Sequence, residues 1–94
     1  MNSTPGYKAS KDQLLTRLAR AEGQVRGVTR MVEDERYCID VLTQIAAAQA
    51  ALDKVALGLL DDHTRNCMSE QVSGAKREAQ VEELMGAVGR LVSH

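Results

Sequence analysis

The sequence predicts an all-α protein, and three observations carry that prediction. The chain of 94 residues contains two Tyr and no Phe or Trp, so its core must be aliphatic, as in helical bundles. It contains one Pro and few runs of β-branched residues, which favours helix over strand. Apolar residues recur at every third or fourth position through three long segments, which is the spacing of one helix face. We therefore expect a single domain of three helices over residues 10–94, preceded by a tail at 1–9.

The first helix is expected to run from about Lys11 to about Glu33. Residues 1–9 are polar, include Pro5 and Gly6, and are expected to be disordered. Ser10 followed by Gln13 matches a capping box at the start of the helix. Its apolar stripe consists of Leu14, Leu18, Ala21, Val25, Val28 and Val32.

The second helix is the longest, from Glu35 to about Cys67, with Asp34 as the expected N-cap. No Pro interrupts it, and only Gly58 weakens it. At 1.5 Å per residue it spans roughly 50 Å, which is long for a globular helix and indicates packing along a partner helix. Its stripe consists of Cys38, Val41, Leu42, Ile45, Gln49, Leu52, Val55, Ala56, Leu59 and His63.

A break at Ser69–Gly74 separates this helix from the third. Val81, Leu84, Met85, Val88, Leu91 and Val92 mark that helix, in which Gly86 and Gly89 lower the helix propensity. Three such helices form a small domain that buries a modest share of its surface, so we expect the chain to oligomerise.

The net charge of −1 conceals an uneven distribution. Residues 8–30 carry six basic and two acidic residues, whereas residues 31–94 carry six basic and eleven acidic ones. A basic first third can meet an anion. Because no apolar run reaches membrane-spanning length and no signal peptide opens the chain, we expect a cytoplasmic protein whose cysteines are reduced and which has no membrane partner.

Three soft donors suggest a metal site. His63 and Cys67 are four positions apart and share a helix face, and Cys38 lies on the same stripe. Yet Cys38 and His63 are about 37 Å apart on a continuous helix, far beyond any metal–ligand bond. If two copies pack antiparallel, Cys38 of one meets His63 and Cys67 of the other, giving two equivalent sites per dimer.

Other interpretations of these residues remain open. Free Cys often packs as a small hydrophobe, and His63 could be a core residue. A catalytic Cys–His pair would need an orienting group and an anion hole, and the sequence offers neither, so we do not expect an enzyme. Two thiolates and one imidazole suit Cu(I), whereas zinc usually takes a fourth ligand.

The segment "RLARAEGQVRGVTRMVEDERYCIDVLTQIAAAQAAL", followed by His63, Cys67 and "VEEL" at 81–84, resembles the CsoR family of bacterial copper-sensing repressors over about residues 11–92. The resemblance implies an all-helical dimer with an antiparallel four-helix core, two of which form a homotetramer. It implies Cu(I) held by Cys38 of one subunit and by His63 and Cys67 of the other. Tyr37 and Glu83 match positions that surround the ligands, although periodicity places Glu83 off the apolar stripe.

The resemblance also gives a polar stripe a role. Gln13, Arg17, Arg20 and Gln24 share one face of the first helix, and such a stripe is by itself usually a solvated face. Arg17 and Lys54 match positions that copper sensors use for DNA, and Lys54 points about 160° away from the Cys38 stripe. We therefore expect Arg17, Arg20, Gln24 and Lys54 to contact double-stranded operator DNA, mainly through phosphates and shape.

The predicted function is a Cu(I)-responsive repressor whose metal-free form binds operator DNA and whose Cu(I) form releases it, derepressing copper-resistance genes. Sister branches of the family sense nickel or cobalt, formaldehyde or persulfide. The nickel and cobalt sensors have His at the position of Cys67 and an N-terminal His, the formaldehyde sensors usually lack that Cys, and the persulfide sensors lack the His. These features favour copper, with persulfide or formaldehyde chemistry at Cys38, or a copper-buffering bundle without DNA function, as alternatives.

Overall fold

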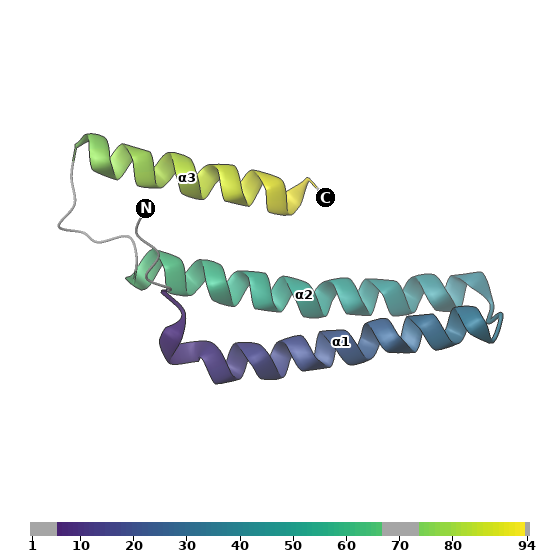
Figure 1. Ribbon diagram of the computed structural model, residues 1–94. Helices are drawn as coiled ribbons and strands as arrows, with labels where there is room; N and C mark the ends of the chain where they lie inside the picture. Colours follow the sequence, from purple (N-terminus) through teal and green to yellow (C-terminus); the bar gives the residue numbers. More distant parts are fainter. Residues whose placement is uncertain (1–5, 67–73, 94) are drawn as a thin grey trace.

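The computed structural model describes residues 6–66 and 74–93, and they form an all-helical protein, as predicted (Figure 1). The elements are a short 3-10 helix η1 (Lys8–Ser10) and the α-helices α1 (Lys11–Glu33), α2 (Cys38–Asn66) and α3 (Ala75–Val92). The described residues contain no strand. No helix among them is both long and apolar enough to span a bilayer.

The bounds of α1 are those that the sequence predicts. Ser10 occupies the N-cap, but its side chain makes no capping hydrogen bond, so only the position of the expected capping box is correct. Asp12 in the first turn and Arg30 in the last complement the helix dipole. Where the sequence predicted a tail without regular structure, Lys8–Ser10 form a turn, because the Ser10 N–H donates to the Tyr7 carbonyl at 2.9 Å.

The start of α2 differs from the prediction. Asp34 is the C-cap of α1 and not the N-cap of α2. The N–H of Glu35 donates to the Val32 carbonyl at 3.0 Å and that of Arg36 to Met31 at 2.9 Å, which is the hydrogen-bond pattern of a Schellman motif. Glu35 has φ of 54°, in the left-handed region where this motif usually places Gly. Because of this motif, α2 begins only at Cys38.

Helices α1 and α2 form an antiparallel hairpin and pack against each other along their length (Figure 1). Its buried apolar side chains are Leu14 and Ala21 from α1 and Ala48 and Val55 from α2. The side-chain amide of Asn66 donates to the Gly6 carbonyl at 2.8 Å, which fastens the start of the described chain to the end of α2. Helix α3 lies beside the second half of α2 but makes almost no close backbone contact with either helix (Figure 1).

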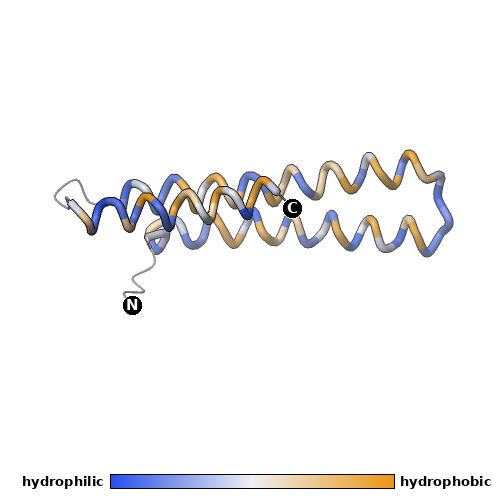
Figure 2. Tube along the Cα trace, turned by 90° about the horizontal axis from the view of Figure 1, so that it is seen from above, coloured by the Kyte–Doolittle hydropathy of each residue, from blue (hydrophilic) through white to orange (hydrophobic). Residues whose placement is uncertain are grey.

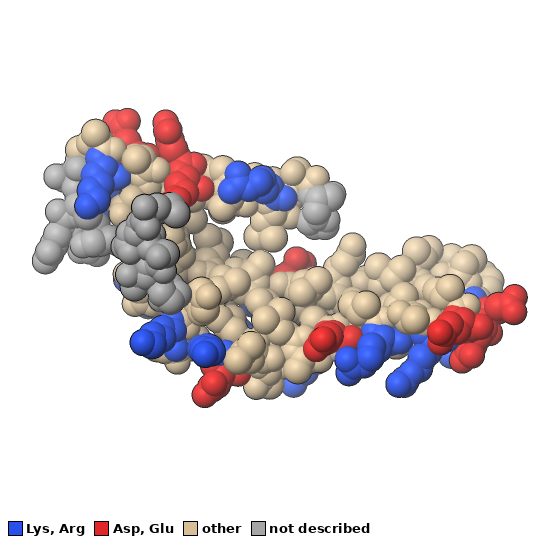
Figure 3. All heavy atoms as spheres, viewed as in Figure 1, with Lys and Arg blue, Asp and Glu red and all other residues tan. Residues whose placement is uncertain are grey.

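A single chain leaves much of its apolar surface exposed. Leu42, Leu52 and Val25 are each about half exposed, and α3 has no buried residue. Apolar positions alternate with polar ones along all three helices (Figure 2), and the α2 surface turned toward α3 carries few charges (Figure 3). Contiguous apolar surface of this kind is typical of a protein–protein interface.

Candidate functional site

The three candidate metal ligands are not brought together within one chain. Cys38 is the first residue of α2 and is exposed, whereas His63 lies in the last turn of the same helix and is half-buried. Cys67 lies outside the described residues. The described residues contain no group of three or more His, Cys, Asp or Glu side chains that could hold a metal ion.

Helix α2 is continuous from Cys38 to Asn66, so the condition behind the length argument is met. A rise of 1.5 Å over the 25 residues between Cys38 and His63 separates them by about 37 Å. No bending of an intact helix closes such a gap. A shared site therefore requires a second chain, or else Cys38 and His63 serve different purposes.

The residues around the candidate ligands are described in part. Tyr37 is exposed, and its carbonyl accepts a 3.2 Å hydrogen bond from the Val41 N–H in the first turn of α2. Its backbone therefore has a structural role whatever its ring does. Glu83 lies on α3 and is exposed.

An ion pair lies on the face of α2 that points away from His63. The Arg65 Nε donates to both carboxylate oxygens of Asp61, at 3.0 and 3.1 Å. This hydrogen bonding, with the charge of Asp61, raises the pKa of the Arg65 guanidinium above its ordinary value. Because Asp61 and Arg65 each lie two positions from His63, they point to the other side of the helix and leave the imidazole free to meet a partner.

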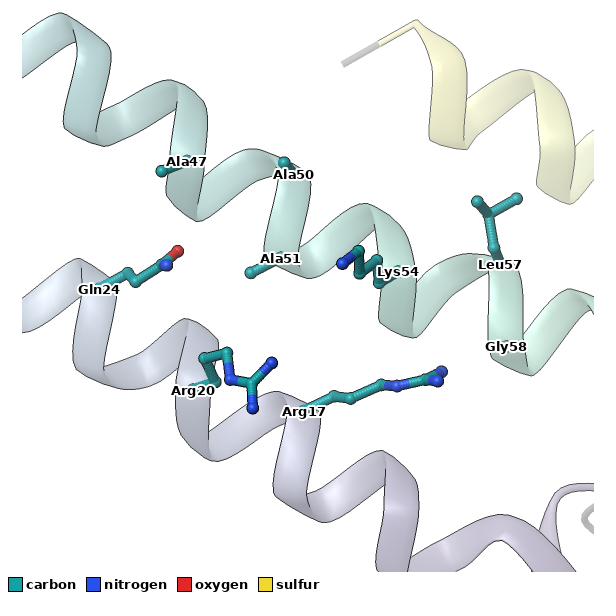
Figure 4. Close-up of a pocket in the computed structure, with 9 residues that line it drawn as sticks. All are labelled: Arg17, Arg20, Gln24, Ala47, Ala50, Ala51, Lys54, Leu57 and Gly58. Atoms are coloured by element: carbon teal, nitrogen blue, oxygen red, sulfur yellow. The ribbon is translucent and has the colours of Figure 1, made fainter.

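The four residues expected to contact DNA line one groove. Its volume is about 790 Å³, and it lies between α1 and α2, where Arg17, Arg20 and Gln24 face Lys54 across the groove (Figure 4). No described residue pairs with Gln24 Oε1, which is a buried acceptor without a hydrogen-bond partner. Gln13, on the same stripe of α1, is exposed and does not line the groove.

The rest of the groove lining was not anticipated from the sequence. Its remaining residues are Ala47, Ala50, Ala51, Leu57 and Gly58 of α2. Most are small, so the long cationic side chains of α1 can extend over α2 instead of being pushed away (Figure 4). The signal was present as small residues at positions 47, 51 and 58, in helical register with Lys54.

The groove and the ligand-bearing stripe occupy different faces of α2. Lys54 points about 160° from Cys38 around the helix, at 100° per residue. Helix α2 thus carries Cys38, His63 and exposed apolar residues on one side, and on the other side it forms one wall of the cationic groove.

The chain resembles known transcriptional repressors over almost its whole length. The family model described as metal-sensitive transcriptional repressor matches residues 10–90. The copper-sensing transcriptional repressor RicR of Mycobacterium tuberculosis is 47% identical, with 98% of each chain covered. The copper-sensing transcriptional repressor CsoR of Bacillus subtilis is 46% identical, covering 89% of this chain and 85% of that protein.

Two solved structures share the fold. The copper-sensing repressor CsoR with Cu(I) from Geobacillus thermodenitrificans superposes with a TM-score of 0.78 at 41% identity, covering 98% of this chain and 93% of that one. The nickel-responsive transcriptional regulator InrS superposes with a TM-score of 0.70, also at 41% identity, covering 85% of this chain and 90% of that one. Since the two are equally similar in sequence, the fold alone does not identify the metal.

Proposed function

Because this chain belongs to the family of metal-sensitive transcriptional repressors, we propose that it is a Cu(I)-responsive repressor of copper-resistance genes. The metal-free protein binds operator DNA, and Cu(I) binding causes its release. The observation that carries the proposal is the presence, on opposite faces of α2, of a soft-donor stripe and a cationic groove. The protein acts in the cytoplasm as a sensor and not as an enzyme.

The proposed metal ligands are Cys38 of one subunit and His63 with Cys67 of an antiparallel partner. Two thiolates and an imidazole form a soft set that favours Cu(I) over harder ions. The exposure of Cys38 and the continuity of α2 support a site completed by a second chain. The apolar side chains left exposed along the same stripe supply the contact surface for that chain.

The proposed DNA contacts are Arg17, Arg20, Gln24 and Lys54. The two guanidinium groups can each hold a phosphate by two hydrogen bonds, and Lys54 adds a positive charge across the groove. The side-chain amide of Gln24 also lines the groove, and its NH2 group can donate to a phosphate oxygen. In a homotetramer these four contacts are repeated over a broad surface.

The two sites are coupled through α2 and its packing against α1. Cys38 at the start of one α2 and His63 with Cys67 at the end of another would hold the ion between them, which would fix the register and angle of the two helices. Each α2 also forms one wall of a groove. Copper thereby favours an arrangement with lower DNA affinity. By linkage, operator DNA weakens copper binding by the same factor. Tyr37 and Glu83 are proposed to pass the ligand geometry on to the surroundings.

The test is the affinity of the protein for a duplex from upstream of its own gene, measured by fluorescence anisotropy with and without Cu(I). We expect tight binding without metal and release at one Cu(I) per chain, with Cys38→Ala binding DNA but failing to respond. If the metal-free protein does not bind the duplex, the result would favour the alternative of a copper-buffering bundle without DNA function. Release by Ni(II), formaldehyde or a persulfide donor, but not by Cu(I), would assign the protein to a sister branch.

A further inference from the structure

Gly58 occupies an unusual position for a glycine. It lies in the interior of α2, where glycine costs stability relative to alanine, and it also lines the cationic groove. Its backbone is an ordinary helical one, so the conformational freedom of glycine does not explain its presence. The explanation must lie in the space that its missing side chain leaves.

That space is filled from α1. A Cβ at position 58 would lie 3.3 Å from Nη1 of Arg17 and 3.3 Å from Cδ2 of Leu14, which is tighter than ordinary van der Waals contact. Leu14 is part of the buried core and has little room to move. The Arg17 guanidinium, by contrast, is the end of a flexible side chain. A methyl group at position 58 would therefore push Arg17 aside by a few tenths of an ångström, and it would also press on Leu14, which cannot move aside as easily.

The other described glycines in the helices do not share this crowding. A Cβ at Gly23 or Gly86 would have its nearest neighbour at 3.7 Å, one at Gly27 at 3.8 Å, and one at Gly89 would meet nothing within 4 Å. Those distances correspond to ordinary contact or open space. The close fit is thus a property of Gly58 and of the two α1 side chains that pass over it.

We propose that Gly58 is a positioning residue for Arg17. Because position 58 has no side chain, the Arg17 guanidinium can lie close to the α2 backbone, and this keeps it in the groove in the absence of DNA. Arg17 is half-buried, and Figure 4 shows it extending from α1 toward Gly58. A side chain that is already ordered loses less conformational entropy when it binds a phosphate. The functional part of this inference rests on the proposed DNA binding.

The effect of Gly58 on the order of the Arg17 side chain is tested without DNA. In the free protein, 15N relaxation of the Arg17 Nε–H should report an ordered group, and Gly58→Ala should lower its order parameter. Gly89→Ala, in α3, is the matched control and should leave the Arg17 signal unchanged. An Arg17 side chain that is equally ordered in the wild type and in Gly58→Ala would overturn the proposal, whether or not the protein binds DNA.

The consequence for DNA is tested by a double-mutant cycle on the upstream duplex. We expect Gly58→Ala to lower the affinity several-fold although alanine is the better helix former, and to have no further effect in the Arg17→Ala background. Equal losses in both backgrounds would mean that Gly58 acts on the groove without Arg17 and would contradict the proposal. A wild-type protein that fails to bind the duplex contradicts the proposed function. The relaxation measurement still decides whether Gly58 positions Arg17.

Discussion

Cys38 opens α2 and His63 lies in its last turn, so one unbroken helix holds these two residues about 37 Å apart. The relationship is rigid, because every residue between them is helical. A metal site that uses both residues therefore needs two chains, and in a twofold dimer with two equivalent sites the two α2 helices must run antiparallel. The same helix carries Lys54 on another face, where it lines the groove between α1 and α2.

Replacing His63 should separate metal binding from the response. In His63→Ala the two thiolates can still hold Cu(I), but the imidazole no longer connects the ion to its surroundings. We expect substantial Cu(I) binding and loss of most of the coupling, which is typically about 1–3 kcal/mol. Operator affinity with and without stoichiometric Cu(I) measures this. Release as complete as in the wild type would show that the coupling runs through the thiolates alone.

Arg17→Ala should weaken DNA binding and leave copper binding almost unchanged. Loss of a charged hydrogen bond to phosphate costs roughly tenfold in affinity. Each lost contact should also reduce the slope of log affinity against log salt by about one. Arg30→Ala is the control, because Arg30 is an exposed cation of the same helix that does not line the groove. Equal effects of the two substitutions would mean that only the overall charge of α1 matters.

Assembly should depend on the apolar stripe of α2. Leu52 is 48% exposed in the single chain, yet we expect it to be covered by the partner chain. Leu52→Lys should therefore shift the protein toward monomers in sedimentation velocity and lower its Cu(I) affinity. Ala50→Lys, on the groove side of the same helix, should keep the assembly intact. A Leu52→Lys protein that sediments as the wild type does would place the interface elsewhere.

The turn between α1 and α2 offers a test of stability. Glu35 adopts φ of 54°, which costs a residue with a side chain about 1 kcal/mol or more. Glu35→Gly should therefore raise the melting temperature slightly, since the relief of strain outweighs the greater entropy of the unfolded chain. Asp34→Gly, at a negative φ of −87°, should lower the melting temperature by contrast. If both substitutions destabilise, the strain at Glu35 is offset by its contacts.

Features that depend on a single helix could be predicted from the sequence. The bounds of α1 and the separation of Cys38 from His63 follow from periodicity and from the rise of a helix. The predicted start of α2 was wrong because Asp34 is a residue type that often forms an N-cap. In the structure Asp34 is the C-cap of α1, and a Schellman motif follows in which Glu35 occupies the position usually taken by glycine. Local sequence preference does not reveal that a Glu will adopt a left-handed backbone conformation.

The groove shows a different limit. Arg17, Arg20 and Gln24 could be grouped from spacing on α1, and Lys54 was added by resemblance to a family. The role of Gly58 could not be found in that way. It depends on which residues of α1 cross α2 at that level, and an uncharged residue without a side chain gives no signal until the two helices are seen together.

The intersubunit site is tested most directly by mixing two defective proteins. Cys38→Ala and His63→Ala each damage both sites of their own homodimer, so neither should form the complete three-ligand site. After subunit exchange, a heterodimer carries Cys38 on one chain and His63 with Cys67 on the other, which restores one intact site. The measurement is the Cu(I)-dependent release of operator DNA by the exchanged mixture. We predict that release reappears in the mixture and is absent from either protein alone. A mixture that exchanges subunits, binds DNA and still fails to respond to Cu(I) would contradict a site shared between chains.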